Sequence, residues 1–87
     1  MNKEKILEGI RYILKEKLEI ITEYSDVDNE TDLVKKFGID SINIINLIVE
    51  IEEYFGVDMS SDDITSETLT KLPFLVRNIE KQKLMDD

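Results

Sequence analysis

The chain has 87 residues, 41% hydrophobic and 36% charged, which fits one small folded domain and leaves no room for a catalytic domain with a separate cofactor-binding domain. Its 20 acidic and 11 basic residues give a net charge of -9, which disfavours binding to nucleic acid or to an anionic membrane surface. The chain has no cysteine and no histidine, which excludes disulfide scaffolds, thiolate nucleophiles, Ser-His-Asp triads and nearly every zinc site.

The first predicted element is an amphipathic helix over about residues 3–18. Apolar side chains recur there at spacings of three and four residues, as the buried face of a helix requires: Ile6, Leu7, Ile10, Ile13, Leu14 and Leu18. The residues from Met1 to Leu7 contain no apolar run of signal-peptide length, and no later run reaches the length of a membrane span. We therefore expect a cytoplasmic protein that does not insert into a membrane.

The helical period is lost between Glu19 and Asp40, where polar residues and Gly38 predict a long connection. Five apolar residues are available to fix this connection to a core: Ile20, Val27, Leu33, Phe37 and Ile39. We interpret the segment as an ordered loop, with one helical turn near residues 31–35.

Two further helices and a short one follow. Asp40 as N-cap and Gly56 as C-terminal stop delimit a helix over residues 41–55. A serine cap predicts a short helix over about residues 60–64, and Pro73 lies in the first turn of a last helix over about residues 71–83. The fold class is therefore all-α: a small bundle of three longer helices and one short helix, forming a single domain over residues 1–87.

The helix over residues 41–55 has two apolar faces, because each residue advances the helix by about 100°. One face is predicted to lie in the core: Ile44, Leu47, Ile48, Ile51 and Phe55. The other face has apolar residues bordered by polar ones: Ile42, Ile45 and Val49, with Asn46, Glu52 and Glu53. A bundle this small cannot bury both faces unless the long loop covers the second. Since acids border the second face, we interpret it as a docking surface for a partner groove rimmed by lysine and arginine.

Ser41 follows the expected cap Asp40, so its hydroxyl lies in the first turn of a helix, near free backbone N–H groups and the positive end of the helix dipole. A phosphate attached to Ser41 would be favourably placed. In isolation, a serine at a helix start most often has only a capping role.

The residues around Ser41 add specificity. The string FGIDSI, the helix ending EIEEYFG and the later segment ITSETLTKL resemble the acyl and peptidyl carrier proteins, in which the serine of a D-S-hydrophobic motif bears 4'-phosphopantetheine. This resemblance covers nearly the whole chain. It implies that Ser41 carries the phosphopantetheine arm, that Asp40 positions it for the modifying enzyme, and that a docking helix is formed by Ile42, Ile45, Asn46, Val49, Glu52 and Glu53.

The resemblance also implies a non-enzymatic, monomeric carrier, whose partners are a phosphopantetheinyl transferase and acyl-transferring and condensing enzymes with basic docking patches. No resident metal is expected. Asn43 and Asn46 stand where typical fatty-acid carriers often have acids, so the pathway stays open between fatty acid and specialised, polyketide-type biosynthesis. An aminoacyl or peptidyl carrier of nonribosomal peptide synthesis or cell-wall D-alanylation is the alternative, and a cofactor-free helical adaptor is a second one.

Overall fold

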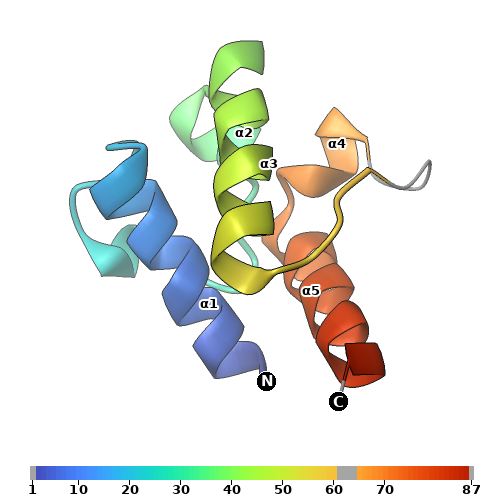
Figure 1. Ribbon diagram of the computed structural model, residues 1–87. Coiled ribbons are helices and arrows are strands. Elements are labelled where there is room, and N and C mark those ends of the chain that lie inside the picture. Colours follow the sequence, from blue (N-terminus) through green and yellow to red (C-terminus); the bar gives the residue numbers. More distant parts are fainter. Residues whose placement is uncertain (1, 61–64, 87) are drawn as a thin grey trace.

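The computed structural model describes residues 2–60 and 65–86. Its elements, shown in Figure 1, are the α-helices α1 (Lys3–Tyr12), α2 (Leu33–Phe37), α3 (Ser41–Phe55), α4 (Ser66–Leu69) and α5 (Leu72–Asp86), the π-helix η1 (Ile13–Lys17) and the 3-10 helix η2 (Tyr24–Asp26). Over the described ranges the only extended pairing is an isolated antiparallel bridge between Asp32 and Lys71. The expected all-α class, with three longer helices, is confirmed.

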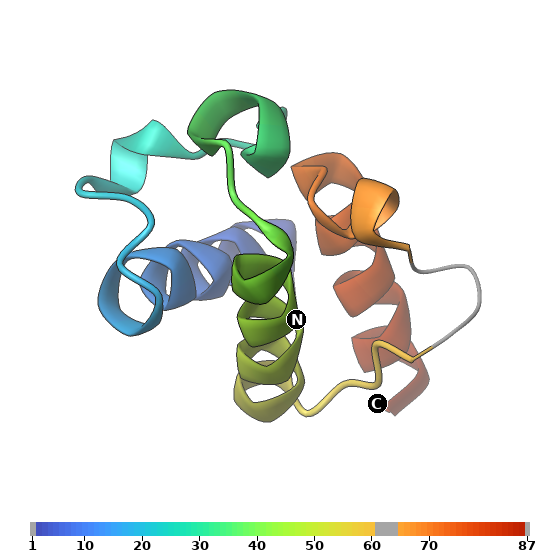
Figure 2. The same cartoon turned by 90° about the horizontal axis from the view of Figure 1, so that it is seen from above.

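The three longer helices enclose the core. Figures 1 and 2 show α3 with α1 on one side and α5 on the other, while α1 also packs against α5. The side chains with almost no exposed surface come from all three helices and their connections: Ile6, Ile10, Ile13, Leu14, Val27, Leu33, Leu47, Ile51, Leu69, Leu72, Leu75 and Ile79. Burial of this apolar surface is the main stabilising contribution to such a bundle.

The first helical segment changes its winding before it ends. After Tyr12 the chain continues as η1, in which the N–H of Leu18 donates to the carbonyl of Ile13, five residues back, at 2.9 Å. The helical extent agrees with the range of 3–18 expected from the apolar spacing, but that spacing gave no sign of the π-helical turn. The segment ends at Glu19, whose φ of 53° lies in the left-handed region.

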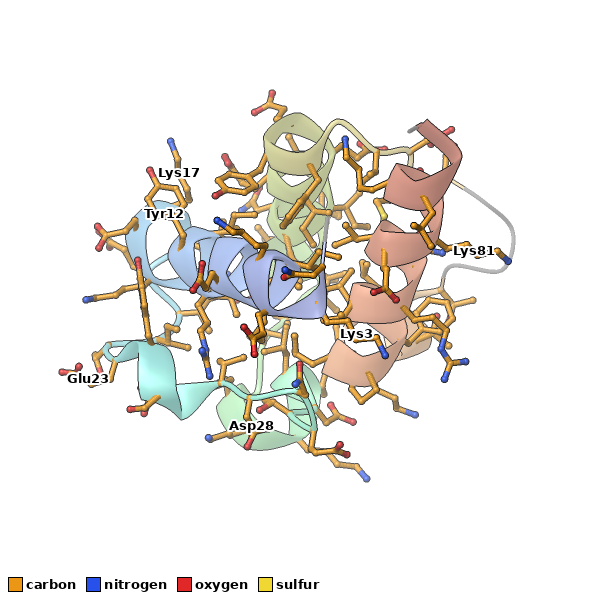
Figure 3. The ribbon with its side chains drawn as sticks, turned by 90° about the horizontal axis from the view of Figure 1, so that it is seen from below. Lys3, Tyr12, Lys17, Glu23, Asp28 and Lys81 are labelled. Carbon is orange, nitrogen blue, oxygen red and sulfur yellow. The ribbon has the colours of Figure 1, made fainter. Side chains whose placement is uncertain are left out.

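The first connection is ordered and fixed to the bundle at several points. Arg11 Nε donates to the carbonyl of Val27 at 2.7 Å. The N–H of Leu33 donates to the carbonyl of Thr70 at 2.8 Å, and the N–H of Leu72 donates to the carbonyl of Thr31 at 2.9 Å. Figure 3 shows this connection beside α1, with the exposed side chains Glu23 and Asp28 directed away from the core. It contains two helical turns: the 3-10 helix η2 at Tyr24–Asp26, which was not expected, and α2 at Leu33–Phe37, slightly later than residues 31–35.

The short helix expected over about residues 60–64 falls almost entirely outside the residues that the structure describes. Ser60 is not helical, and residues 61–64 lie outside the described residues. A short helix within the described residues, α4, lies at Ser66–Leu69, where the side chain of Thr65 accepts a hydrogen bond from the N–H of Thr68 as N-cap. The last helix begins at Leu72 and continues to Asp86, three residues beyond the expected end.

Candidate functional site

The start of α3 is defined by a reciprocal cap. Asp40 Oδ1 accepts a hydrogen bond from the N–H of Asn43 at 2.9 Å, and Asn43 Oδ1 accepts one from the N–H of Asp40 at 3.5 Å. This arrangement satisfies two backbone donors that the first turn of a helix otherwise leaves free. Asn43 thus has a structural role in the cap.

Ser41 is the first residue of α3 and its side chain is exposed. Its position follows from the cap, because Asp40 with extended backbone angles (φ -96°, ψ -178°) precedes the helical turn. The hydroxyl is therefore accessible to a second protein and lies at the positive end of a 15-residue helix. A phosphodiester at this oxygen would be stabilised by the helix dipole, so the residues present fit an attached phosphopantetheine.

The two apolar faces of α3 differ in burial. On the inner face Leu47, Ile51 and Phe55 are buried, and Ile44 and Ile48 are partly buried against the core. On the outer face Ile42, Ile45 and Val49 are 66%, 59% and 45% exposed. We call these three residues the docking strip. The first loop does not cover them, so the covering alternative considered for this face is wrong.

Polar residues border the docking strip along α3. Asn46 and Glu53 are exposed, while Glu52 is partly buried and its Oε2 accepts a hydrogen bond from the N–H of Met59 at 3.0 Å. At a rise of about 1.5 Å per residue, Glu53 lies about 18 Å along the axis from Ser41. The structure thus places the serine at one end of the strip and the acids at the other. The contact of Glu52 with the following loop was not foreseen, since the sequence pattern carries no signal for it.

Neither a metal site nor a membrane span is evident in the described part of the chain. Residues 2–60 and 65–86 contain no group of three or more acidic side chains placed to hold a metal ion. None of the helices described is long and apolar enough to cross a membrane. The cytoplasmic location expected from the sequence stays a prediction.

Comparison with known proteins decides the family. The family model described as "Phosphopantetheine attachment site" matches residues 8–72, which include α1 from its middle onwards, the first connection, α3 and α4. The chain belongs to the acyl carrier protein family. It is 31% identical over 81 residues to the acyl carrier protein of Thermotoga maritima, covering 93% of this chain and 95% of the relative. The acyl carrier protein of Helicobacter pylori strain G27 is 30% identical over 79 residues, covering 91% and 96%.

A third relative, the acyl carrier protein of Acidothermus cellulolyticus, is 34% identical over 64 residues, which is 74% of each chain. This carrier protein therefore has phosphopantetheine as its cofactor and is not a catalyst. Acyl carrier proteins work with a phosphopantetheinyl transferase and with synthases in general. The small bundle fits that role, because it presents an exposed serine at the start of α3 and an exposed apolar face along the same helix.

Proposed function

We propose that this acyl carrier protein receives its 4'-phosphopantetheine arm on Ser41. The observation that carries the proposal is the exposed position of Ser41 as first residue of α3, directly after the capping Asp40. The arm supplies a thiol on which acyl groups are held as thioesters. The chain itself supplies the attachment oxygen, the helix dipole that stabilises the phosphodiester, and the surface that partners bind.

In the loading step, Ser41 Oγ attacks the pyrophosphate of coenzyme A within the transferase. A bond forms between Oγ and the phosphorus next to the pantetheine, the bond to the nucleotide phosphate breaks, and the hydroxyl proton passes to a base of the transferase. Asp40 holds the first turn of α3 in place beside Ser41 through its bond to Asn43. The carrier is the substrate of this reaction, not its catalyst.

Partners then bind along α3, with the docking strip in an apolar groove and Asn46, Glu52 and Glu53 at its border. Their basic residues would complement the net charge of -9. We assign the cargo to acyl intermediates of fatty acid or specialised, polyketide-type biosynthesis, since the relatives that cover most of this chain bear the name acyl carrier protein. Once the carrier has docked, tethering of the cargo gives each later reaction a high effective concentration.

The test is the mass of the intact protein before and after incubation with coenzyme A and a broad-specificity phosphopantetheinyl transferase. Wild type should gain one phosphopantetheine and, because the chain has no cysteine, one thiol equivalent towards a thiol reagent. Ser41→Ala should gain neither. Ser25→Ala, at an exposed serine in η2, is the matched control and should load like wild type.

Loading of Ser41→Ala at the wild-type rate would show that another residue carries the arm. A wild-type protein that gains no mass with an active transferase would contradict the carrier assignment and favour a cofactor-free adaptor. The cargo is then identified by incubating the loaded protein with malonyl and amino acid donors and their transferring enzymes. Aminoacylation in place of acylation would move this protein to the aminoacyl carriers.

A further inference from the structure

Two acids adjacent in the sequence have different surroundings at the end of α3. Glu52 Oε2 accepts a hydrogen bond from the N–H of Met59 at 3.0 Å, and the side chain of Met59 is only 4% exposed. Glu53 is exposed. The carboxylate of Glu52 is thus engaged within the fold, on a loop whose buried methionine fixes its position.

The same loop is held from α5. Gln82 Oε1 accepts from the N–H of Asp58 and Gln82 Nε2 donates to the carbonyl of Asp58, both at 2.9 Å. Gln82 Nε2 also donates to Asn78 Oδ1 at 2.7 Å, and Lys83 Nζ donates to the carbonyl of Phe55 at 2.9 Å. In Figures 1 and 2 the segment after α3 crosses from the end of that helix to α5, as these bonds require. Side chains of two helices therefore fix its backbone.

Both acids border the docking strip, on opposite sides. Glu52 follows Val49 by three residues and Ile45 by seven, so it lies on the side of the strip that faces the loop. Glu53 follows Val49 by four residues and lies on the other side, with Asn46. A partner bound to the strip would meet an ordered loop on one side and a solvated carboxylate on the other.

Resting on the proposed function, we propose that Glu52 is a positioning residue that fixes the loop beside the docking strip, and that Glu53 supplies the charge that meets the partner. The partner surface that fits is an apolar groove with a lysine or arginine on the Glu53 side of the strip. A loop that is already ordered loses less conformational entropy when the partner docks. The hydrogen bond between Glu52 and Met59 therefore raises the affinity of the carrier for its partner. The two carboxylates have separate roles.

The experiment compares three variants of the full chain: Glu52→Gln, Glu53→Gln and Glu52→Ala. The two glutamine variants remove one charge each and are a matched pair, but the amide side chain in Glu52→Gln keeps an oxygen that accepts from the N–H of Met59. The first readout is the transferase's KM for the carrier, with the kcat of loading, at saturating coenzyme A and low salt. The second is the rate of hydrogen exchange at the backbone amide of Met59.

Glu53→Gln should raise KM about two- to fivefold, as loss of a surface charge pair does, and should leave the Met59 amide protected. Glu52→Gln should keep both the wild-type KM and the protection. Glu52→Ala should lose the protection and raise KM with kcat unchanged. An equal rise of KM in both glutamine variants, an unchanged KM in Glu53→Gln, or a protected Met59 amide in Glu52→Ala would overturn the proposal.

Failure of the proposed function is a distinguishable result. A wild-type chain that is not loaded at all would remove the docking role of Glu53 together with the carrier assignment. Protection of Met59 across the same variants would then still decide whether Glu52 holds the loop.

Discussion

Asp40 Oδ1 accepts a hydrogen bond from the N–H of Asn43 at 2.9 Å, which joins the residue before Ser41 to the first turn of α3. The carboxylate of Asp40 caps the helix, and because it is adjacent to the proposed attachment serine it can also act electrostatically during loading. The two tasks require different properties of the side chain, because capping needs an acceptor oxygen whereas an electrostatic role in loading needs the charge.

Substitutions at Asp40 separate these tasks. Asp40→Ala removes the acceptor and should lower the free energy of unfolding by about 1 kcal/mol. Asp40→Asn keeps an acceptor and should remain within about 0.5 kcal/mol of wild type, because asparagine caps about as well as aspartate. Both variants should load more slowly. Urea unfolding and the loading rate measure the two effects, and normal loading of Asp40→Asn would limit Asp40 to capping.

The two faces of α3 should respond differently to truncation. Leu47→Ala creates a cavity in the core and should cost about 2 to 5 kcal/mol, a large part of the roughly 5 to 15 kcal/mol that stabilises a small domain. Ile45→Ala, at a side chain that is 59% exposed, should hardly change the melting temperature but should slow loading at subsaturating carrier. Thermal melting and loading rates are the measurements. Early melting of Ile45→Ala would place the docking strip in the core.

The left-handed backbone at Glu19 predicts a stabilising substitution. A residue with a Cβ at φ 53° is strained, whereas glycine adopts this conformation without penalty. Glu19→Gly should therefore raise the free energy of unfolding by up to about 1 kcal/mol, since relief of strain exceeds the added entropy of the unfolded chain.

Glu16→Gly is the matched control for Glu19→Gly, because it makes the same change at an exposed position within the helical turn η1. It should lower stability by about 1 kcal/mol. Both are measured by urea unfolding. Destabilisation of equal size in both variants would show that Glu19 is not strained in solution.

Asp58 provides a prediction on pH. Hydrogen bonds from the hydroxyl of Ser60, at 2.6 Å, and from its backbone N–H, at 2.9 Å, lower the pKa of Asp58 below its ordinary value of 3.8. Since the folded pKa is the lower one, ionised Asp58 stabilises the fold above pH 3.8, and this contribution is lost as the pH falls through the folded pKa.

Ser60→Ala should move the pKa of Asp58 up towards 3.8 in a carboxyl NMR titration. Asp28 is the internal control, because its pKa is lowered chiefly by the N–H of Glu30 and by Thr31, and it should titrate as in wild type. The stability difference between variant and wild type should shrink in acid. A pKa of Asp58 that does not move in Ser60→Ala would contradict the assignment.

The sequence by itself determined α3 and its surroundings, because the signals there are local. A capping aspartate, an uninterrupted apolar run and Gly56 with φ 67° delimit the helix within its own residues, and the second apolar face follows from the helical period alone. The resemblance around Ser41 identified the carrier family for the same reason, since the motif is contiguous in the chain. These features needed no knowledge of packing.

Only the tertiary structure decided the remaining features. The π-helical turn η1 and the position of α4 depend on which turns pack against the core. The spacing of apolar residues in the sequence predicts neither of them. The bond from Met59 to Glu52 joins residues on either side of a turn, and Gln82 meets Asp58 across 24 residues of chain. Such contacts arise when loops close over a packed core, so two neighbouring glutamates that look equivalent in the sequence acquire different surroundings in the fold.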